Sequence, residues 1–395
     1  MYLCTPKRTI LEVNKVRVIK VSSRKEMNDF IRLTRKIYKE CPQYVPDLES
    51  SVRELFDVRC NFGLECSKVQ PFVAYRDNET VGRIVGIVNR CTNERWGTKN
   101  VRFSMIEFID DREVSAALLD AVEQWGRELG MTAIQGPMGI TDFDKEGMLV
   151  EDFHLTGSMN TIYNPAYYPH HLEALGFEKE VDWVQIRINI PTEVPAKYAR
   201  VAQYVREQMG LRVIKMTNKD LLERGYGKKA FELLNTAYQP IFGFAALSEK
   251  QITQYLKKYL KVIDMQLVPI IINQQDEVVG IAVSMGSLSI AMQKANGRLL
   301  PFGWYHLLKS LKWKHEDNAE MLLIAVRPDL QGMGVNTLFF EDLIPIYNRY
   351  GFKWAETGPQ LEYNSHELTQ WKPLNPQLVK RRRCYKKRLE VTSQL

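Results

Sequence analysis

The sequence predicts an α/β protein made of two tandem copies of one domain, each a mixed, mostly antiparallel sheet with flanking helices. Two segments about two hundred residues apart match without a gap: PFVAYRDNETVG, from Pro71 to Gly82, and PIIINQQDEVVG, from Pro269 to Gly280. Each has an apolar run, a polar turn and a second apolar run, which is the pattern of a β-hairpin.

Two further pairs of segments occur in the same order. RVIKV at residues 17–21 matches RVIKM at residues 212–216, and each precedes a helical pattern. ELGMTAIQGP at residues 128–137 resembles RYGFKWAETGP at residues 349–359, and each of these follows an amphipathic helix that ends at a glycine. Three ordered pairs favour tandem copies over a chance similarity of common hairpins.

The junction between the copies is predicted near INIPTEVPAKY, where Pro191 and Pro195 interrupt the pattern. We therefore expect one domain at residues 1–192 and a second at residues 193–395. Strands alternate with helices after each hairpin, so helices should cover both faces of each sheet.

The composition is that of an ordinary soluble globular protein, with 45% hydrophobic and 26% charged residues and a net charge of +7. The six cysteines include no CxxC pair, and His170-His171 has no companion ligands, so we expect no metal site. The N-terminus lacks an apolar signal region, and no run approaches the ~18 apolar residues of a membrane span. These features predict a cytoplasmic protein with reduced thiols and no membrane partner.

A strand candidate, EMLLIAV at residues 320–326, leads through Arg327–Leu330 into Gln-Gly-Met-Gly-Val-Asn at residues 331–336 and then a helix. Free N–H groups and the helix dipole make such a turn an anion site, and glycine lets a phosphate approach the backbone. A GxG turn alone is also compatible with a plain tight turn. Pro345, inside the helix that follows, should kink or interrupt it.

The order strand, glycine turn, helix resembles the acyl-coenzyme A motif of the GNAT family of N-acyltransferases, Gln/Arg-x-x-Gly-x-Gly/Ala. Gln331 fills the first place and Gly334 the fourth, whereas Asn336 stands where Gly or Ala is usual. In the first copy, NPAYYPHHLEALGF at residues 164–177 resembles a later helix of that family.

The resemblance implies that the pantetheine arm lies between splayed strands and that the pyrophosphate binds the amides of the glycine turn. An amine then attacks the thioester of acetyl-CoA, or of another acyl-CoA, directly and without a metal. The residues expected at the cofactor are Ala325, Val326, Gln331, Gly332, Met333, Gly334, Val335 and Asn336.

The first copy differs at this position. The alignment places Asp110–Ser115, which reads DDREVS, opposite the glycine turn. Carboxylates at a helix start suit that helix, and Asp110 or Asp111 is expected to cap it, but they repel a pyrophosphate. We therefore expect only the second copy to bind the cofactor.

The catalytic candidates come from the second copy. Glu356, on the strand KWAETG, is expected as the general base, and Glu320 is a second candidate. Tyr363 is the nearest phenol for an acid, because Trp371 lies where a tyrosine is expected; Tyr167 and Tyr168 match the motif better but belong to the first copy. A site assembled across the halves stays open.

Other features leave the function less determined. Aromatic residues of two segments could line an acceptor pocket or belong to the core: Tyr238, Phe242, Phe244, Phe302, Trp304 and Tyr305. The basic run at residues 380–388 is interpreted as a closing strand with cations on its solvent face. An N-acetyltransferase with a small-molecule or peptide acceptor is expected; the alternatives are a non-catalytic binding protein and, less favoured, a nucleic-acid binder through that basic run.

Overall fold

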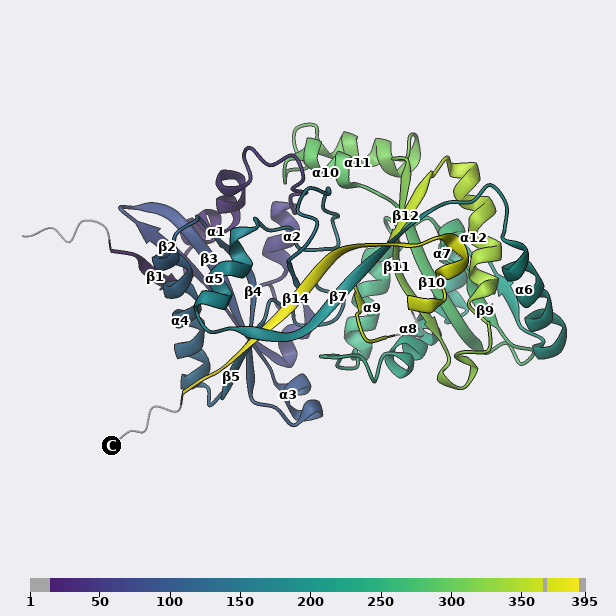
Figure 1. Ribbon diagram of the computed structural model, residues 1–395, viewed down its shortest axis with the longest axis horizontal. Coiled ribbons are helices and arrows are strands. Elements are labelled where there is room, and N and C mark those ends of the chain that lie inside the picture. The colour runs from purple at the N-terminus through teal and green to yellow at the C-terminus, as the bar shows by residue number, and fades with distance from the viewer. Residues whose placement is uncertain (1–14, 365–367, 391–395) are drawn as a thin grey trace, which may run out of the picture.

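The computed structural model describes residues 15–364 and 368–390. Within these residues, one continuous 14-stranded sheet runs the length of the molecule, with helices on both faces (Figure 1). The predicted mixed α/β class with flanking helices is confirmed.

The strands are β1 (Arg17–Lys20), β2 (Ser67–Arg76), β3 (Glu79–Asn89), β4 (Asn100–Phe108), β5 (Ala133–Gly136), β6 (Met148–Leu149), β7 (Glu178–Asn189), β8 (Arg212–Ile214), β9 (Ile270–Ile272), β10 (Val278–Gly286), β11 (Asn318–Val326), β12 (Trp354–Thr357), β13 (Gln360–Leu361) and β14 (Gln377–Arg388). The α-helices are α1 (Arg24–Ile37), α2 (Glu49–Glu54), α3 (Arg90–Trp96), α4 (Arg112–Glu128), α5 (Tyr167–Ala174), α6 (Ala196–Met209), α7 (Asn218–Glu223), α8 (Tyr226–Ala237), α9 (Glu249–Tyr259), α10 (Ser289–Ala295), α11 (Gly303–Lys312) and α12 (Thr337–Tyr350). The 3₁₀ turns are η1 (Phe62–Glu65), η2 (Met265–Leu267), η3 (Pro328–Leu330) and η4 (Lys372–Leu374).

The repeats in the sequence correspond to repeats in the sheet. The order of the main path is β1-β2-β3-β4-β5-β14-β7-β12-β11-β10-β9-β8, so the two halves run outward from the centre in the same sequence of strands. In each half an antiparallel hairpin, β2–β3 or β9–β10, is followed by one parallel pair, β4–β5 or β11–β12.

The closing strands are exchanged between the halves. β7, which precedes the predicted junction, pairs with β12, and β14 from the C-terminus pairs with β5. The two exchanged strands also pair with each other, so they cross the middle of the molecule together (Figure 1). The junction predicted after residue 192 lies in the loop between β7 and α6, and its role as a domain boundary stays a prediction.

Alternating side chains build the core of the C-terminal half. Ile281 on β10 packs toward α8 and α9, whereas its neighbour Ala282 packs toward α6 and α12, as the two-residue period of a strand requires. The same alternation on β11 directs Ala325 to the first face and Ile324 to the second. Two apolar layers therefore enclose β10 and β11.

Three expectations need correction. Cys66 and Cys91 form a disulfide, because η1 and α3 bring them together across the β2–β3 hairpin, so reduced thiols are wrong for this pair. Of the two outcomes expected at Pro345, an interruption is wrong, because α12 continues to Tyr350, whereas a kink stays a prediction. The cations of residues 380–388 are not all on a solvent face, because Lys380 and Arg382 are buried.

Candidate functional site

The turn before α12 has a backbone conformation that suits glycine. Gly332 and Gly334 have φ of +77° and +83°, in the left-handed region that other residues avoid. A Cβ at Gly334 would lie 2.5 Å from Cγ1 of Val201 on α6, so α6 packs directly against the turn. Among the described residues, no acceptor takes the amides of Gly332, Gly334 or Val335, which leaves donors free at a helix start.

Asn336 departs from the family pattern without a backbone cost. Its φ is −60°, so this position does not need the conformational freedom of glycine. Its Nδ2 donates to Oε1 of Gln370 at 2.6 Å, which ties the turn to the C-terminal segment. Gln331 also braces the turn, because its Nε2 donates to the carbonyl of Val326 at 3.0 Å.

The sheet forks beside this turn. β11 and β12 pair only from Asn318 to Met321, and the amide of Gly358 closes the pairing on the Met321 carbonyl at 2.8 Å. From Leu322 onward β11 keeps its ladder with β10 alone. From Leu322 to Val326, the backbone edge that faces away from β10 thus has no strand partner among the described residues, and the Ile324 carbonyl accepts from the Tyr238 hydroxyl instead.

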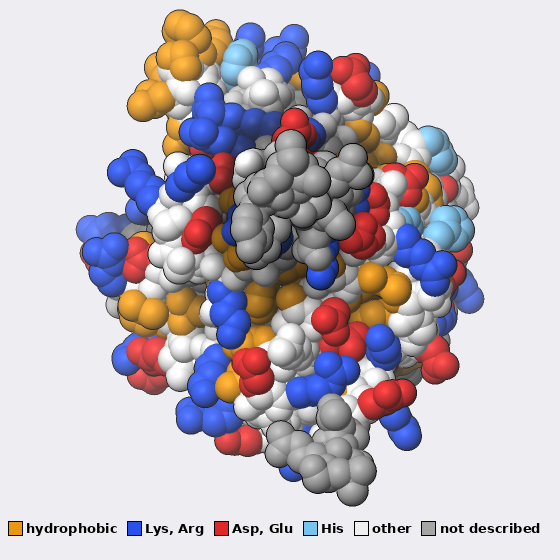
Figure 2. Space-filling view, turned by 90° about the vertical axis from the view of Figure 1, so that its left-hand side faces the viewer, with side chains coloured by type: hydrophobic (Ala, Val, Ile, Leu, Met, Phe, Trp, Pro, Cys, Tyr) orange, Lys and Arg blue, Asp and Glu red, His pale blue; other side chains and the backbone are white. Residues whose placement is uncertain are grey.

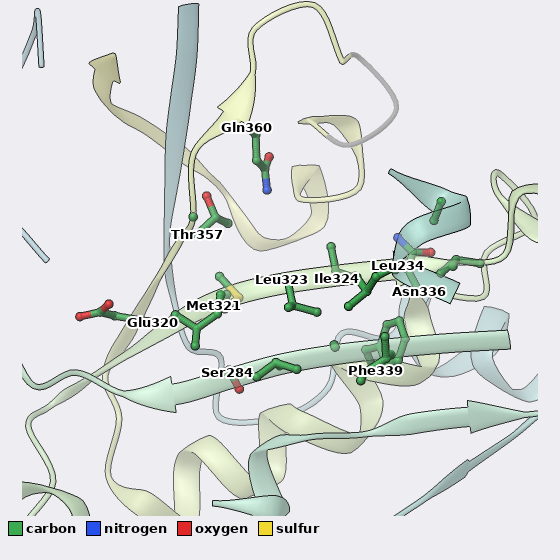
Figure 3. Close-up of a pocket in the computed structure, with 18 of the residues that line it drawn as sticks. Leu234, Ser284, Glu320, Met321, Leu323, Ile324, Asn336, Phe339, Thr357 and Gln360 are labelled. Carbon is green, nitrogen blue, oxygen red and sulfur yellow. The ribbon is translucent and has the colours of Figure 1, made fainter. Parts of the chain in front are cut away.

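A cavity of about 920 Å³ occupies the fork, near the upper end of the roughly 300–1,000 Å³ of small-molecule sites. Figure 3 shows its floor along β11, with Glu320 at one end and Asn336 at the other. All the residues expected at the cofactor line it except Met333, whose side chain is exposed. Its far wall is apolar and comes from α7 to α9 and β10, including Leu221, Ala230, Phe231, Leu234, Leu256 and Ile281.

Glu320 is a buried carboxyl group on the cavity wall. Its oxygens accept hydrogen bonds from Oγ of Ser287 at 3.0 Å and from Nδ2 of Asn160 at 2.7 Å. Burial raises the pKa of Glu320 to about 7, against the lowering effect of these two donors. A carboxyl with this pKa exchanges a proton near neutral pH, as a general base must.

Glu356 also lines the cavity, but cations hold it. Its Oε1 accepts from Nζ of Lys380 at 2.5 Å and from Nε2 of Gln185 at 3.0 Å, and its Oε2 accepts from Nη2 of Arg187 at 2.7 Å. Lys380 and Glu356 are both almost fully buried. Breaking such a pair leaves an uncompensated charge, so Glu356 is built into the junction of β7, β12 and β14.

Comparisons with known proteins agree with this geometry. No family model matches the chain. A tandem GNAT protein from the clavulanic acid biosynthesis pathway, solved without AcCoA, superposes with a TM-score of 0.58 at 10% identity, covering 96% of this chain and 100% of its own. A GCN5-related glucosamine N-acetyltransferase region in a fungal multi-domain GH3 β-N-acetylglucosaminidase superposes with a TM-score of 0.56 at 12% identity, covering 95% and 38%.

The chain has the GNAT fold. Its sequence is 27% identical over 377 residues to protein YghO of Escherichia coli (strain K12), covering 93% of this chain and 94% of that protein. It is 28% identical over 317 residues to a bacterial ceramide synthase of Caulobacter vibrioides (strain NA1000 / CB15N), covering 80% and 81%. The tandem GNAT arrangement extends along nearly the whole chain.

The other residues that the sequence suggested for the site lie partly in the cavity wall, partly in the core and partly in the first half. Tyr363 lines the cavity with a largely exposed side chain, after β13. Trp371 is buried against Phe340, at 5.2 Å between ring centroids. Tyr167 and Tyr168 belong to the first half instead, since the Tyr167 hydroxyl donates to the carbonyl of Phe108 and the Tyr168 hydroxyl accepts from the Phe108 amide.

The aromatic segments divide between cavity, core and surface. Tyr238 lines the cavity, and its hydroxyl donates to the Ile324 carbonyl of β11 at 3.0 Å. Phe242 packs on Trp183, and Phe244 is buried. The second cluster is not part of the cavity: Phe302, Trp304 and Tyr305 are exposed.

Sequence reasoning missed the residues that the first half contributes to this cavity. Asp142, Glu146 and Asn160 lie in loops between β5 and α5, yet all three line it. Both carboxylate oxygens of Asp142 are buried without a hydrogen-bond partner among the described residues. Burial raises the pKa of Asp142 and of Glu146, and the neighbouring charge of Asp142 raises the pKa of Glu146 further. The sequence shows three closely spaced acidic residues in DFDKEG at residues 142–147, but it does not show that this loop faces the C-terminal half.

The basic run is neutralised inside the protein. Arg383 donates to Asp182 at 2.8 Å, and Lys386 and Lys387 donate to Glu180 and Glu123. These partners leave few free cations for a nucleic acid. Within residues 15–364 and 368–390, no group of His, Cys, Asp and Glu could hold a metal ion, and no helix is long and apolar enough to cross a membrane.

Proposed function

We propose that this protein transfers an acyl group from acyl-CoA to an amine, with the cofactor in the C-terminal half. The observation that carries this proposal is the set of free amides in the glycine turn beside the forked strands. The amides suit a pyrophosphate, and the open edge of β11 suits the amide groups of a pantetheine arm. The fold and the kinship to a ceramide synthase support an acyltransferase.

We propose a long acyl chain rather than acetyl. The far wall of the cavity is a broad apolar surface from α8, α9 and β10, which an acetyl group would leave largely unfilled. An alkyl chain buries apolar area against it at roughly 25 cal/mol per Å². The acceptor is then an amine with apolar character, approaching past the first-half loop where Asp142 and Glu146 suit a cationic group.

In this mechanism Glu320 takes a proton from the ammonium form of the acceptor. The free amine attacks the thioester carbonyl, the carbon–sulfur bond breaks, and the coenzyme A thiolate leaves and takes up a proton. Geometry favours Glu320 over Glu356 as the base, because the Glu356 carboxylate is occupied by Lys380 and Arg187. Tyr363 stays a candidate for the acid that protonates the thiolate.

The direct test is binding and turnover with acyl-CoA of increasing chain length. Calorimetry should show binding of long-chain acyl-CoA, and mass spectrometry should show an amide product with a long-chain primary amine. Binding without turnover across an amine panel would favour a binding protein. Absence of binding for every acyl-CoA would remove the proposal.

Two variants assign the base. Glu320→Gln should retain acyl-CoA binding and lose about 10²–10⁴-fold in kcat. Glu356→Gln should instead lower the melting temperature, since a broken buried pair costs about 3–5 kcal/mol. If Glu356→Gln keeps its stability and loses turnover while Glu320→Gln stays active, the assignment is reversed.

A further inference from the structure

The segment that joins β10 to β11 carries a cluster of exposed apolar side chains. It comprises Leu299, Leu300, Phe302, Trp304, Tyr305 and Trp313, which are between 40% and 76% exposed. These residues come from the loop between α10 and α11, from α11 and from its C-cap. Figure 2 shows apolar side chains beside basic ones at the top of the molecule, the side where α10 and α11 lie in Figure 1.

The cluster is organised by contacts among its own members. The rings of Trp304 and Tyr305 lie 6.2 Å apart, and those of Tyr305 and Trp313 lie 6.3 Å apart. Lys309 Nζ lies 6.0 Å from the Tyr305 ring. Residues four apart share a helix face, so Tyr305, Lys309 and Trp313 form one surface.

The charged residues of the segment that carries this cluster have one sign. Residues 278–315 contain no Asp or Glu. The same stretch has five cations, namely Lys294, Arg298, Lys309, Lys312 and Lys314. All are exposed, and among the described residues only Arg298 pairs with a carboxylate, that of Glu49.

An exposed cluster of apolar side chains with cations beside it indicates an interaction site. Trp and Tyr favour the boundary between water and lipid, where the ring is apolar on one side and polar at its tip. Lysines beside them are attracted to anionic headgroups. Both properties occur together on short amphipathic segments that lie in a membrane surface without crossing it.

We propose that the surface formed by residues 298–314 binds an anionic lipid bilayer. The absence of a spanning helix among the described residues does not bear on such peripheral contact. The sequence-based expectation of no membrane partner considered only apolar segments that enter or cross a membrane. Peripheral binding to a membrane surface is a different kind of contact. The proposal also does not depend on the proposed acyl transfer.

The buried side of the same segment adjoins the candidate site. Leu307 and Leu311 of α11 pack in a cluster with Leu322, which lines the cavity. Ser287, just before α10, donates to Glu320, and Oγ of Ser310 on α11 donates to the Ser287 carbonyl. A bilayer on the outer face would therefore lie over helices that support the cavity.

The test is co-sedimentation of the full chain with vesicles of phosphatidylethanolamine and phosphatidylglycerol, against vesicles of phosphatidylcholine. The wild-type protein should sediment with the anionic vesicles, and less so at high salt. Phe302→Glu combined with Trp313→Glu should weaken binding at least tenfold. Tyr204→Glu on α6 is the matched control, because Tyr204 is an equally exposed aromatic elsewhere, and it should bind normally.

Lys309→Glu combined with Lys312→Glu should remove the preference for anionic vesicles. Circular dichroism and thermal melting verify that each variant is folded. The proposal is overturned if the wild-type protein ignores both vesicles, or if the patch variants bind as well as Tyr204→Glu. A dimer in sedimentation velocity that Phe302→Glu dissolves, without vesicle binding, would assign the patch to a second copy of the chain instead.

Discussion

The two halves begin equivalent helices in opposite ways. At α4, Asp111 caps the helix by accepting from the amides of Glu113 and Val114, and Arg76 pairs with Asp111 at 2.6 Å. At α12, no side chain caps the helix, and the amides of Gly332, Gly334 and Val335 find no acceptor among the described residues. The described residues thus satisfy one helix start and leave N–H donors without an acceptor at the other.

A second difference concerns two buried glutamates on matching strands. Glu107 on β4 and Glu320 on β11 both have a pKa that burial raises to about 7. Glu107 accepts from the hydroxyls of Tyr38 and Tyr168, at 2.6 Å and 2.9 Å, which close its surroundings. Glu320 lines the cavity. Glu107 lies near the end of β4 and Glu320 near the start of β11, so the two carboxyl groups differ in position: the first is enclosed by packing and the second faces the cavity.

The largest expected effect separates these two glutamates. Glu320→Gln should lower kcat by about 10²–10⁴-fold, whereas Glu107→Gln should leave turnover unchanged. Because the raised pKa of Glu320 keeps it protonated below about pH 7, wild-type kcat should fall as pH drops through 7. Steady-state kinetics between pH 5.5 and 9 measure both. An equal loss of kcat in Glu320→Gln and Glu107→Gln would show that the two glutamates do not differ in their role in turnover.

The next effect concerns charge at the turn. Met333 is exposed and is not a glycine, so Met333→Glu adds a carboxylate without backbone strain. Repulsion of a pyrophosphate should weaken acyl-CoA binding about tenfold or more. Met333→Gln is the control of the same shape and should bind normally. Calorimetric titration measures the acyl-CoA affinity of both variants. Equal affinities would show that the pyrophosphate does not bind at this turn.

Filling the apolar wall should change the accepted chain. Ala230 on α8 is buried and lines the cavity, so Ala230→Phe reduces the space available to an alkyl chain. We expect a shift of several-fold in kcat/KM from long toward short acyl-CoA. The measurement is a chain-length series with both proteins. If the variant keeps the long-chain preference, the acyl chain lies elsewhere.

A smaller effect concerns stability and pH. A carboxyl whose folded pKa is raised contributes stability that is present at low pH and lost as pH rises through that pKa. Raising the pKa of Glu107 from 4.5 to about 7 corresponds to roughly 3 kcal/mol of stability that is lost as pH rises from about 4.5 to about 7. Glu107→Gln should flatten this dependence in urea unfolding, and an unchanged slope would contradict the raised pKa.

The smallest effect is that of the cap in the first half. Asp111→Ala should cost about 1 kcal/mol of stability, since it removes the acceptor for two amides. Acyl-CoA affinity should not change, because this helix start is not in the cavity. Thermal unfolding and titration together check the prediction, and gain of a second acyl-CoA site would show that the first half is only blocked, not remodelled.

Much of the fold was predictable because local patterns carry it. The alternation and turns of residues 71–82 and 269–280 specify β2–β3 and β9–β10. The conformation of the glycine turn was also predictable, since the positive φ at Gly332 and Gly334 is one that glycine adopts readily, whereas its role at the cofactor stays a prediction. The preference between Glu356 and Glu320 was not, because it depends on which cations come near each carboxylate.

By itself, the sequence determined the two-copy plan, the strands and helices of each copy, and the inequality of the two turns. These depend on period, turn residues and local charge, which act within a few residues. Only the tertiary structure decided that β7 and β14 exchange between the halves, that Lys380 is buried on Glu356, and that Asp142 and Asn160 reach the cavity of the other half. Those contacts join residues from 24 positions apart, for Lys380 and Glu356, to more than 200 apart, for β5 and β14, and their energies arise from burial and pairing that exist only once both halves are folded.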